Sequence, residues 1–429
     1  MFSKMLFRDS SSARRGLPAL CLAIFCSLIL SGPAVAQQLQ QYEQFIISSG
    51  EWMLARQLPN GAYPYSDADP SVFPNVQAIS GLATLSAYQA CLALNDCEDI
   101  DFSDPAIEAQ DFLDAALLTG DYLINGGFAN FGTGLPNIRN FDPLFLVRLS
   151  NVSGDPQYAE FLEDNFWDLL ENGTYGPTSD WDMDDFIANM IATRDCSAAL
   201  SGTVAAWDLG FLAAAASEAG ITQFDQAIID GTRTALGFGA DSSVVVGVSG
   251  FDIMGLAGGI WVAGVTGANV TPTTGTWAST TTNSQLVGIL LDHQSSEGAF
   301  LQSTASDNNP IDPADTVSQT TAFALLALAE YDSELYFSRI SAALNSLANV
   351  FLQPSGRMSY FHPDFDLDGT DDPKPFVYAH AFGLYAVSER GDTPPPTPPV
   401  AVPTLSYLGL LALMLLLGMF AWKAVALRQ

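Results

Sequence analysis

A short turn that combines a glycine with an aromatic residue recurs along the chain, and its spacing constrains the fold more than any other feature. The clearest copies, residues 57–63 and 294–300, both read Gln-x3-Gly-x-aromatic. The related turns lie 46 to 66 residues apart, about 59 on average, and a period of this size marks a repeat architecture. Four units are clear, and six would fill residues 37–392. The candidate turn glycines are Gly61, Gly127, Gly173, Gly239, Gly298 and Gly356.

Two of the units align in more detail as helix, turn, loop and helix. Residues 45–56 and 283–293 lead into the turns, and residues 75–85 and 319–328 follow loops rich in Pro and Asp. The second helix of each unit carries Ala, Leu and other small residues nearly all round, which is typical of a helix buried on every side. Residues 205–219 and 376–387 follow the same pattern. Residues 244–248 and 271–282 instead favour strand or loop and interrupt the fourth and fifth units.

Pairs of a buried inner helix and an amphipathic outer helix can close into a ring when six are present. On its Gln-x3-Gly-x-aromatic turns and the run Thr-Thr-Ala-Phe-Ala-Leu-Leu-Ala-Leu at 320–328, the chain resembles the α/α toroids of the terpene cyclase and protein prenyltransferase superfamily. The resemblance implies an all-α toroid of about six helix-pair repeats. An open α-solenoid is the alternative. Toroids include cyclases, transferases, polysaccharide enzymes and binding domains without catalysis, so the fold alone selects no function.

The first 36 residues have the pattern of an export signal. Basic residues precede an apolar run from Leu17 to Leu30, and the small residues Ala34 and Ala36 follow it. We therefore predict a signal peptide over 1–36 that is cleaved after Ala36. The alternative is a membrane anchor, but 14 apolar residues reach only about 21 Å across a hydrocarbon core of roughly 30 Å.

The other end of the sequence predicts a spacer and a membrane segment. Residues 393–402 are Pro-rich and stiff, and the apolar run 405–422 makes about 27 Å of helix, enough to span a bilayer. Residues 403–429 resemble the IPTL-CTERM sorting signal of Gram-negative bacteria, with Tyr407-Leu408-Gly409 where Trp-Gly is usual and Val in place of the motif's Ile. The motif residues are Val402, Pro403, Thr404, Leu405 and Ser406.

The resemblance of the tail implies an exosortase-type sorting enzyme as a partner. It also implies a helix that tethers the protein to the inner membrane and delivery to the cell surface or extracellular matrix. A permanent C-terminal anchor is the alternative. Either reading places residues 37–392 outside the cytoplasm, in or beyond the periplasm.

The charge of this exported segment excludes whole classes of partner. Residues 37–392 contain 46 acidic and nine basic residues, and Lys374 is the only lysine. Nucleic-acid binding depends on neutralising phosphates with Lys and Arg, so no nucleic-acid partner is expected. Docking on anionic lipid headgroups through this segment is disfavoured for the same reason.

Three cysteines lie downstream of the signal. In an oxidising compartment Cys91 and Cys97 are close enough in sequence to form a disulfide. Cys196 is then left over, either buried or free. A zinc site built on cysteines is not expected, because the chain has no CxxC pair and only three histidines.

Acidic residues cluster in loops that precede the expected inner helices, which predicts an acidic mouth on the toroid. Asp182-Met-Asp184-Asp185 matches the Asp-x-Asp-Asp proton donor of class II terpene cyclases, in which neighbouring groups keep one carboxylic acid neutral. The following Phe186-Ile187 departs from the Thr-Ala of that family, and export separates the protein from isoprenoids. Helix capping by these aspartates is the competing interpretation.

A second acidic cluster resembles the start of a calcium loop. Asp364, Asp366 and Asp368 stand at positions 1, 3 and 5, and Gly369 supplies the sharp turn. Pro375 occupies position 12 in place of the bidentate Glu, so Asp371 or Asp372 would have to complete the site. We predict a weak calcium site at Asp364, Asp366, Asp368 and Asp371, with a solvated acidic loop as the alternative.

A histidine on the last inner helix, His380, falls where prenyltransferase β subunits place a zinc ligand. The Asp and Cys partners of that zinc site have no counterpart in this sequence, so we expect a hydrogen-bonded core histidine. The sequence also contains no Gly-x-Ser-x-Gly, phosphate loop or dinucleotide fingerprint.

The sequence therefore favours an exported, membrane-tethered toroid that binds a ligand or matrix at the cell surface. The alternative is a hydrolase or lyase of an extracellular polysaccharide, with carboxylates from 180–185 and 364–372 as acid and base. A class II terpene cyclase-like enzyme is a more distant alternative.

Overall fold

The computed structural model describes most of the predicted exported segment. The described residues are 42–66, 69–93, 107–132, 134–138, 141–192, 206–238, 253–302, 311–360, 362–363 and 377–390. The chain divides into Met1–Thr393 and Pro394–Gln429, and only the first unit contains described residues. The predicted signal, spacer, sorting motif and membrane segment lie outside the described residues. Among the helices of the described residues, none is long and apolar enough to cross a membrane.

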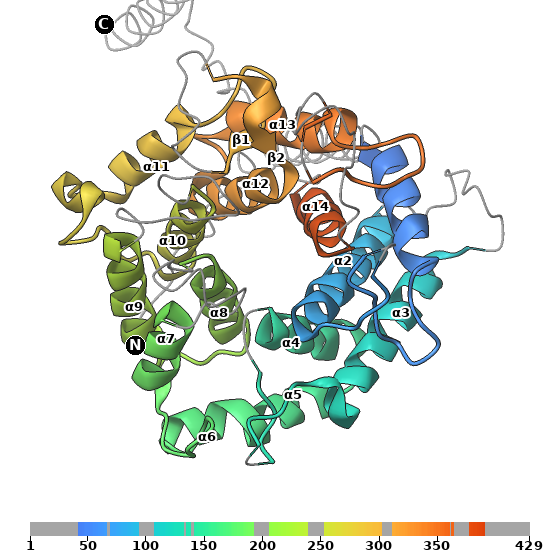
Figure 1. The fold of residues 1–429 in the computed structure, drawn as a ribbon, viewed down its shortest axis with the longest axis vertical. Coiled ribbons are helices and arrows are strands. Elements are labelled where there is room, and N and C mark those ends of the chain that lie inside the picture. Colours follow the sequence, from blue (N-terminus) through green and yellow to red (C-terminus); the bar gives the residue numbers. More distant parts are fainter. Residues whose placement is uncertain are drawn as a thin grey trace, which may run out of the picture. The chain divides into compact units, whose positions relative to one another are not determined.

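Six helices of the described residues form a closed inner ring (Figure 1). Each packs against the next along the chain, and the last returns to pack against the first. This closure confirms the predicted α/α toroid, and the open solenoid was wrong. The inner helices are α2 (Pro74–Ala93), α4 (Asp142–Ser153), α8 (Ala206–Glu218), α10 (Ile253–Thr266), α12 (Ser318–Asp332) and α14 (Val377–Arg390).

An outer layer of helices surrounds this ring, and along the chain an outer helix precedes each inner helix (Figure 1). The outer helices are residues 42–54, α3 (Ala109–Tyr122), α5 (Gln157–Leu162), α6 (Asp168–Glu171), α9 (Asp225–Phe238), α11 (Asn283–Asp292) and α13 (Phe337–Asn345). A further helix, α7 (Met183–Ala192), packs against α6 and α9. Strands β1 (Phe300–Leu301) and β2 (Thr316–Val317) pair antiparallel ahead of α12.

The inner helices form because their small apolar residues can be buried all round. Every residue of α12 from Ser318 to Ala329 is buried, as is every residue of α10 from Ile253 to Ala263. Gly264 lets α10 approach α12 closely, since a Cβ at this position would overlap the backbone of Glu330 and Tyr331. The inner helices therefore pack closely against one another and form the core of the ring.

The recurring turns join one repeat to the next. Gly61, Gly298 and Gly356 have φ values of 88°, 91° and 78°, in the left-handed region that favours glycine. A Cβ on each would overlap a backbone carbonyl of the following outer helix: Leu118 in α3, Ala342 in α13 and Ser48 in residues 42–54. The third contact links the last repeat to the first and closes the ring.

The other predicted turn glycines behave differently. Gly173 has a positive φ of 61°, but a Cβ there would meet only Asp182 at ordinary contact distance. In the second unit the left-handed residue is Gly126, with φ 109°, and not the predicted Gly127. Gly239 lies outside the described residues. The turn is thus regular in three units and altered in the second and third.

Three inner helices hold the preceding turn with an equivalent side chain. Gln77, Thr321 and His380 accept hydrogen bonds from the backbone N–H groups of Tyr63, Phe300 and Met358, at 2.6, 3.0 and 2.8 Å. The other ring nitrogen of His380 lies 3.0 Å from the carbonyl oxygen of Ser49. His380 is therefore a buried, hydrogen-bonded core residue, as expected.

Candidate functional site

The axis of the ring is filled by aromatic side chains. Four inner helices and Phe141, the residue that precedes α4, contribute to this cluster. The ring centroids lie 4.7 to 5.6 Å apart along the chain of contacts from Phe141 through Phe211 to Trp261 and Phe323. Phe382 contacts both Phe141, at 5.1 Å, and Phe323, at 4.9 Å. All of these side chains are buried. The aromatic cluster comprises Phe141, Phe211, Trp261, Phe323, Phe382 and Tyr385.

The aromatic cluster separates the two ends of the ring. Because an antiparallel outer helix precedes each inner helix, the inner helices run parallel, and their N-termini gather at one end, here called the mouth. The N-terminal N–H group of an inner helix donates to a carbonyl in the loop before the next inner helix of the ring. The three bonds run from Ile253 to Gln302, from Ser318 to Tyr360 and from Val377 to Tyr65. The other end, formed by the C-terminal turns of the inner helices, is called the base.

Two buried carboxylates lie in the first turns of neighbouring inner helices. Asp142 opens α4 and Asp208 lies in the first turn of α8, and their exposed fractions are only 3% and 6%. Each is adjacent to the aromatic cluster, because Asp142 follows Phe141 and Asp208 lies one turn before Phe211. Burial of an aspartate requires compensation, and the positive end of a helix dipole supplies part of it.

Aromatic residues also gather near the starts of α14 and α2. The rings of Tyr65 and Phe73 are 5.0 Å apart, those of Tyr65 and Tyr378 are 5.7 Å apart, and those of Tyr378 and Tyr360 are 6.5 Å apart. Phe73 is 42% exposed, and the hydroxyl of Tyr360 accepts a hydrogen bond from the Gln302 amide at 3.0 Å. The mouth thus combines buried carboxylates with a partly exposed row of aromatic rings.

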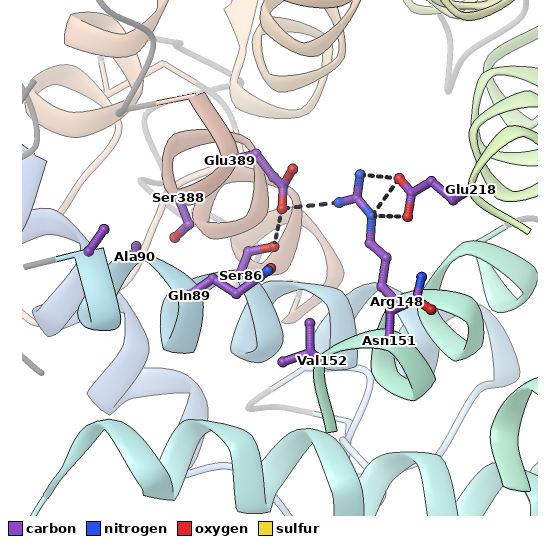
Figure 2. A pocket seen from close by; sticks show the side chains of 10 residues that line it. Ser86, Gln89, Ala90, Arg148, Asn151, Val152, Glu218, Ser388 and Glu389 are labelled. Carbon is purple, nitrogen blue, oxygen red and sulfur yellow. Dashed lines mark hydrogen bonds and ion pairs between the residues drawn. The ribbon is translucent and has the colours of Figure 1, made fainter. Parts of the chain in front are cut away.

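At the base, an arginine is held between two glutamates (Figure 2). Arg148 of α4 donates from Nε and Nη2 to Glu218 of α8, at 2.7 to 3.1 Å, and its Nη1 lies 3.0 Å from Glu389 of α14. Nη1 also donates to the hydroxyl of Tyr385 at 2.9 Å. Burial by itself would lower the pKa of Arg148, but Tyr385, Glu389 and Glu218 outweigh it, and the pKa is raised. The guanidinium therefore stays charged.

A hollow of about 340 Å³ lies beside this ion cluster. Its polar lining includes Gln89 and Ser86 of α2, Asn151 of α4 and Ser388 of α14, in addition to the charged residues (Figure 2). Ala90, Ala93 and Val152 supply an apolar wall. The hollow is thus formed by the same helices whose starts bear the mouth residues, at their opposite ends.

The predicted Asp-x-Asp-Asp site is found on the outside of the ring. Asp182, Asp184 and Asp185 open α7, which packs against the outer helices α6 and α9, so they do not precede an inner helix as predicted. All three are exposed, and Oδ1 of Asp182 accepts a hydrogen bond from the Asp185 N–H at 3.0 Å. Asp182 therefore caps α7, and the buried residue of this segment is Met183.

The other predicted sites fall partly or wholly outside the described residues. Asp364, Asp366, Asp368 and Asp371 are not among them, so the calcium site stays a prediction, and the described residues contain no group of three or more metal-ligating side chains. Cys91 is buried and disulfide-bonded, but Cys97 is not described, so this pairing also stays a prediction. Cys196 is likewise outside the described part of the chain.

Sequence reasoning missed Asp142 and Asp208, although a signal was present. Both lie in the pattern aromatic-Asp-x-x-Phe, as Phe141-Asp142-Pro-Leu-Phe145 and Trp207-Asp208-Leu-Gly-Phe211. The density of other acids drew attention to loops instead. A search for acids that recur at the same place in two repeats would have found this pair.

The comparisons with known proteins support the fold. No family model matches the sequence, and no curated protein matches it. A cellobiose 2-epimerase from Spirochaeta thermophila DSM 6192 is similar in structure over 84% of this chain and 98% of its own, with 14% identity and a TM-score of 0.50. A UGL variant described with the oligosaccharide dGlcA-Glc-Rha-Glc is similar over 82% of this chain and 98% of its own, with 13% identity and a TM-score of 0.51. At such identities the likeness shows the shared α/α toroid fold.

Proposed function

We propose that this protein acts on a carbohydrate at the mouth of the ring, with Asp142 and Asp208 as its acid and base. The observation that carries the proposal is the burial of these two carboxylates on neighbouring inner helices, on either side of the contact between Phe141 and Phe211. The polysaccharide hydrolase or lyase expected from the sequence as an alternative thus becomes the favoured function, with a different carboxylate pair.

The chemistry needs one carboxyl group of each kind. In hydrolysis, a protonated carboxyl donates its proton to the leaving glycosidic oxygen, while an ionised carboxylate orients water or attacks the sugar. In a lyase, the carboxylate removes a carbon-bound proton and the acid assists departure of the leaving group. Both reactions benefit from a site sheltered from bulk water, which the buried first turns of α4 and α8 provide.

Carbohydrate is the favoured substrate class for two reasons. Sugar rings stack on aromatic side chains, and Phe73, Tyr65 and Tyr378 form such a row at the same end of the ring. The two toroids of similar fold are described with sugar chemistry, one as a cellobiose epimerase and one with an oligosaccharide.

The test compares isosteric variants of the full chain. Asp142→Asn and Asp208→Asn should each lower the turnover of a responsive glycan by about 10²- to 10⁴-fold, since each removes one proton-transfer group. Reducing-end release and double-bond formation, followed across neutral and uronic-acid oligosaccharides, identify the reaction. Asp182→Asn, at the exposed cap of α7, is the control and should turn over normally. Undiminished turnover in both Asn variants would refute the assignment.

The second candidate function is binding without catalysis, and the row of mouth aromatics favours it. A glycan that binds but is never cleaved, with binding lost in Tyr378→Ala and kept in Asp142→Asn, would identify a surface binding module. Tyr378 is only partly buried but packs against the core, so a thermal melt of Tyr378→Ala must show that the variant is folded.

The predicted location belongs to the same proposal. We propose that the protein is exported after cleavage behind Ala36 and is held by its C-terminal helix, with an exosortase-type enzyme as sorting partner. The intact mass of protein recovered from cell envelopes tests this. A mature N-terminus at Gln37 supports export, and an intact residue 1–36 segment contradicts it.

A further inference from the structure

The hollow at the base differs from an ordinary structural ion pair, because its charges do not balance. Two carboxylates, Glu218 and Glu389, face one guanidinium, Arg148. The side chains of Arg148 and Glu389 are 17% and 18% exposed, and that of Glu218 is 32% exposed. A net negative charge in a partly buried place is unfavourable unless a cation or hydrogen-bond donors compensate it.

The arginine has little left to offer a ligand. Its Nε and Nη2 are engaged by Glu218, and its Nη1 is engaged by Glu389 and Tyr385. The polar groups that remain to contact a ligand in the hollow are mainly hydrogen-bond acceptors, chiefly the carboxylate oxygens of Glu218 and Glu389. Among the described residues, Ser86 and Arg148 both contact Oε1 of Glu389, and Oε2 remains as an acceptor toward the hollow.

A buried hydroxyl provides an independent indication of a ligand. Ser388 lines the hollow beside Glu389 (Figure 2) and is only 6% exposed. Its Oγ has no hydrogen-bond partner among the described residues. Buried hydroxyls in native proteins are nearly always bonded, so this one marks a place where a ligand donor would fit.

We propose that the hollow at the base binds a small aliphatic primary amine. Its ammonium group would donate to Glu389 Oε2, Ser388 Oγ and the side-chain carbonyl of Gln89 or Asn151, and it would neutralise the excess carboxylate. Its alkyl chain would lie along Ala90, Ala93 and Val152. The volume of about 340 Å³ is at the small end of the usual range for ligand sites and suits such a molecule.

This proposal is independent of the carbohydrate chemistry at the mouth, because the aromatic cluster separates the two ends. It concerns different residues and a ligand of opposite chemical character, so either proposal can fail while the other stands.

The experiment uses the purified full chain at low ionic strength and butylamine as the probe. Calorimetry and thermal melts are run with butylamine, with butanol, which has the chain without the charge, and with tetramethylammonium, which has the charge without N–H donors. We expect butylamine alone to bind and raise the melting temperature. Equal binding of butanol or of tetramethylammonium would overturn the proposal, as would the absence of binding by butylamine.

Two variants locate the site. Glu389→Gln should weaken butylamine binding about tenfold or more, because it removes a charged acceptor. Ser388→Ala should weaken it about threefold, the loss of one neutral hydrogen bond. Glu171→Gln on the outer helix α6 and Ser153→Ala, whose hydroxyl bonds the carbonyl of Leu149 instead, are matched controls and should bind normally. Unchanged binding in both base variants would overturn the proposal.

Discussion

The mouth and the base of the ring hold carboxylates at opposite ends of the inner helices, buried at the mouth and partly exposed at the base. At the mouth, Asp142 and Asp208 lie in first helical turns, where the exposed N–H groups and the helix dipole favour negative charge. At the base, Glu218 and Glu389 lie in last turns, where the dipole disfavours it. At the base, Arg148 offsets this unfavourable placement by pairing with both glutamates.

The difference shows that the two ends of a ring of parallel helices provide opposite electrostatic environments. All six starts face one way, so the positive ends of the helix dipoles favour the acids that are buried at the mouth. All six ends face the other way, so acids there become part of an ion cluster that ties α4, α8 and α14 together. The following predictions test this contrast, from the largest expected effect to the smallest.

The largest effect should come from removing the cation of the base. Arg148→Met leaves two partly buried glutamates without their partner, and we expect a loss of about 3 kcal/mol in the free energy of unfolding. Denaturant melts measure it. Arg233→Met is the control for a more exposed arginine. Arg233 pairs with Asp230 and donates to the carbonyl of Asn269, and we expect a smaller loss of about 1 to 2 kcal/mol.

A variant without charges at the base end of the ring would show whether unbalanced charge causes the loss. The triple variant Arg148→Met, Glu218→Gln and Glu389→Gln removes all three charges together, and it should recover most of the stability lost in Arg148→Met. If the triple variant is as unstable as the single one, packing rather than unbalanced charge explains the loss.

The second effect concerns the predicted calcium loop, which leads into the start of α14 at the mouth. If Asp364, Asp366 and Asp368 bind calcium, the melting temperature should rise by about 3 °C between EDTA and saturating calcium, roughly 2 kcal/mol for a domain of this size. Asp366→Ala should abolish the rise, and Asp184→Ala on α7 should keep it. A rise that persists in Asp366→Ala would place the ion elsewhere.

A smaller effect is expected at the mouth carboxylates. Since helix starts accept Asn almost as well as Asp, Asp142→Asn and Asp208→Asn should each cost about 1 kcal/mol or less. Thermal melts measured beside turnover separate stability from catalysis. A loss as large as that of Arg148→Met would show that the mouth carboxylates are held by a charged partner and that the contrast between the two ends is wrong.

The smallest effect lies on the outer layer, at Glu163, which is exposed to solvent and surrounded by other acids. Burial raises the pKa of Glu163, and nearby Asp168, Glu171 and Asp164 raise it further. A raised carboxyl pKa means that the folded protein holds the proton more tightly, so its contribution to stability falls as pH rises through that pKa. Glu163→Gln should therefore stabilise the protein at neutral pH by about 0.5 kcal/mol or less.

Acidification provides the control for this variant. Once both the folded and the unfolded chain are protonated at position 163, Gln and Glu are equivalent, and the two melting curves should coincide. A gain that persists at low pH would contradict the electrostatic cause.

The repeat pattern predicted helix-pair units, and the toroid followed from the resemblance that the turns carry, with an open solenoid as the alternative. A glycine at the left-handed position and a small-residue inner helix follow from spacing and composition, and Gly61 and Gly298 lie where the aligned turns placed them. The closing contact between Gly356 and Ser48 was not visible, since it joins residues about 300 apart in sequence. Only the sixfold count suggested it.

The functional residues were harder to predict, because a count of acids does not reveal which of them are buried. Asp182, Asp184 and Asp185 attracted attention as a cluster, but α7 is an extra helix in the outer layer and leaves them exposed. Asp142 and Asp208 are single acids between apolar neighbours in the sequence. Their importance depends on the ring that brings α4 beside α8.

The Gly356 turn contacts Ser48, and a ring nitrogen of His380 lies within hydrogen-bonding distance of the Ser49 carbonyl. The last repeat is therefore a direct neighbour of the first helix, residues 42–54. A ring of this kind has no first or last member, so the gene's order of repeats is one of six equivalent cuts through a circle. A circular permutant that joins residue 390 to residue 42 by a linker and opens between α9 and α10 would keep every contact described above. By contrast, deletion of a single helix pair would leave five members to span a circumference set by six.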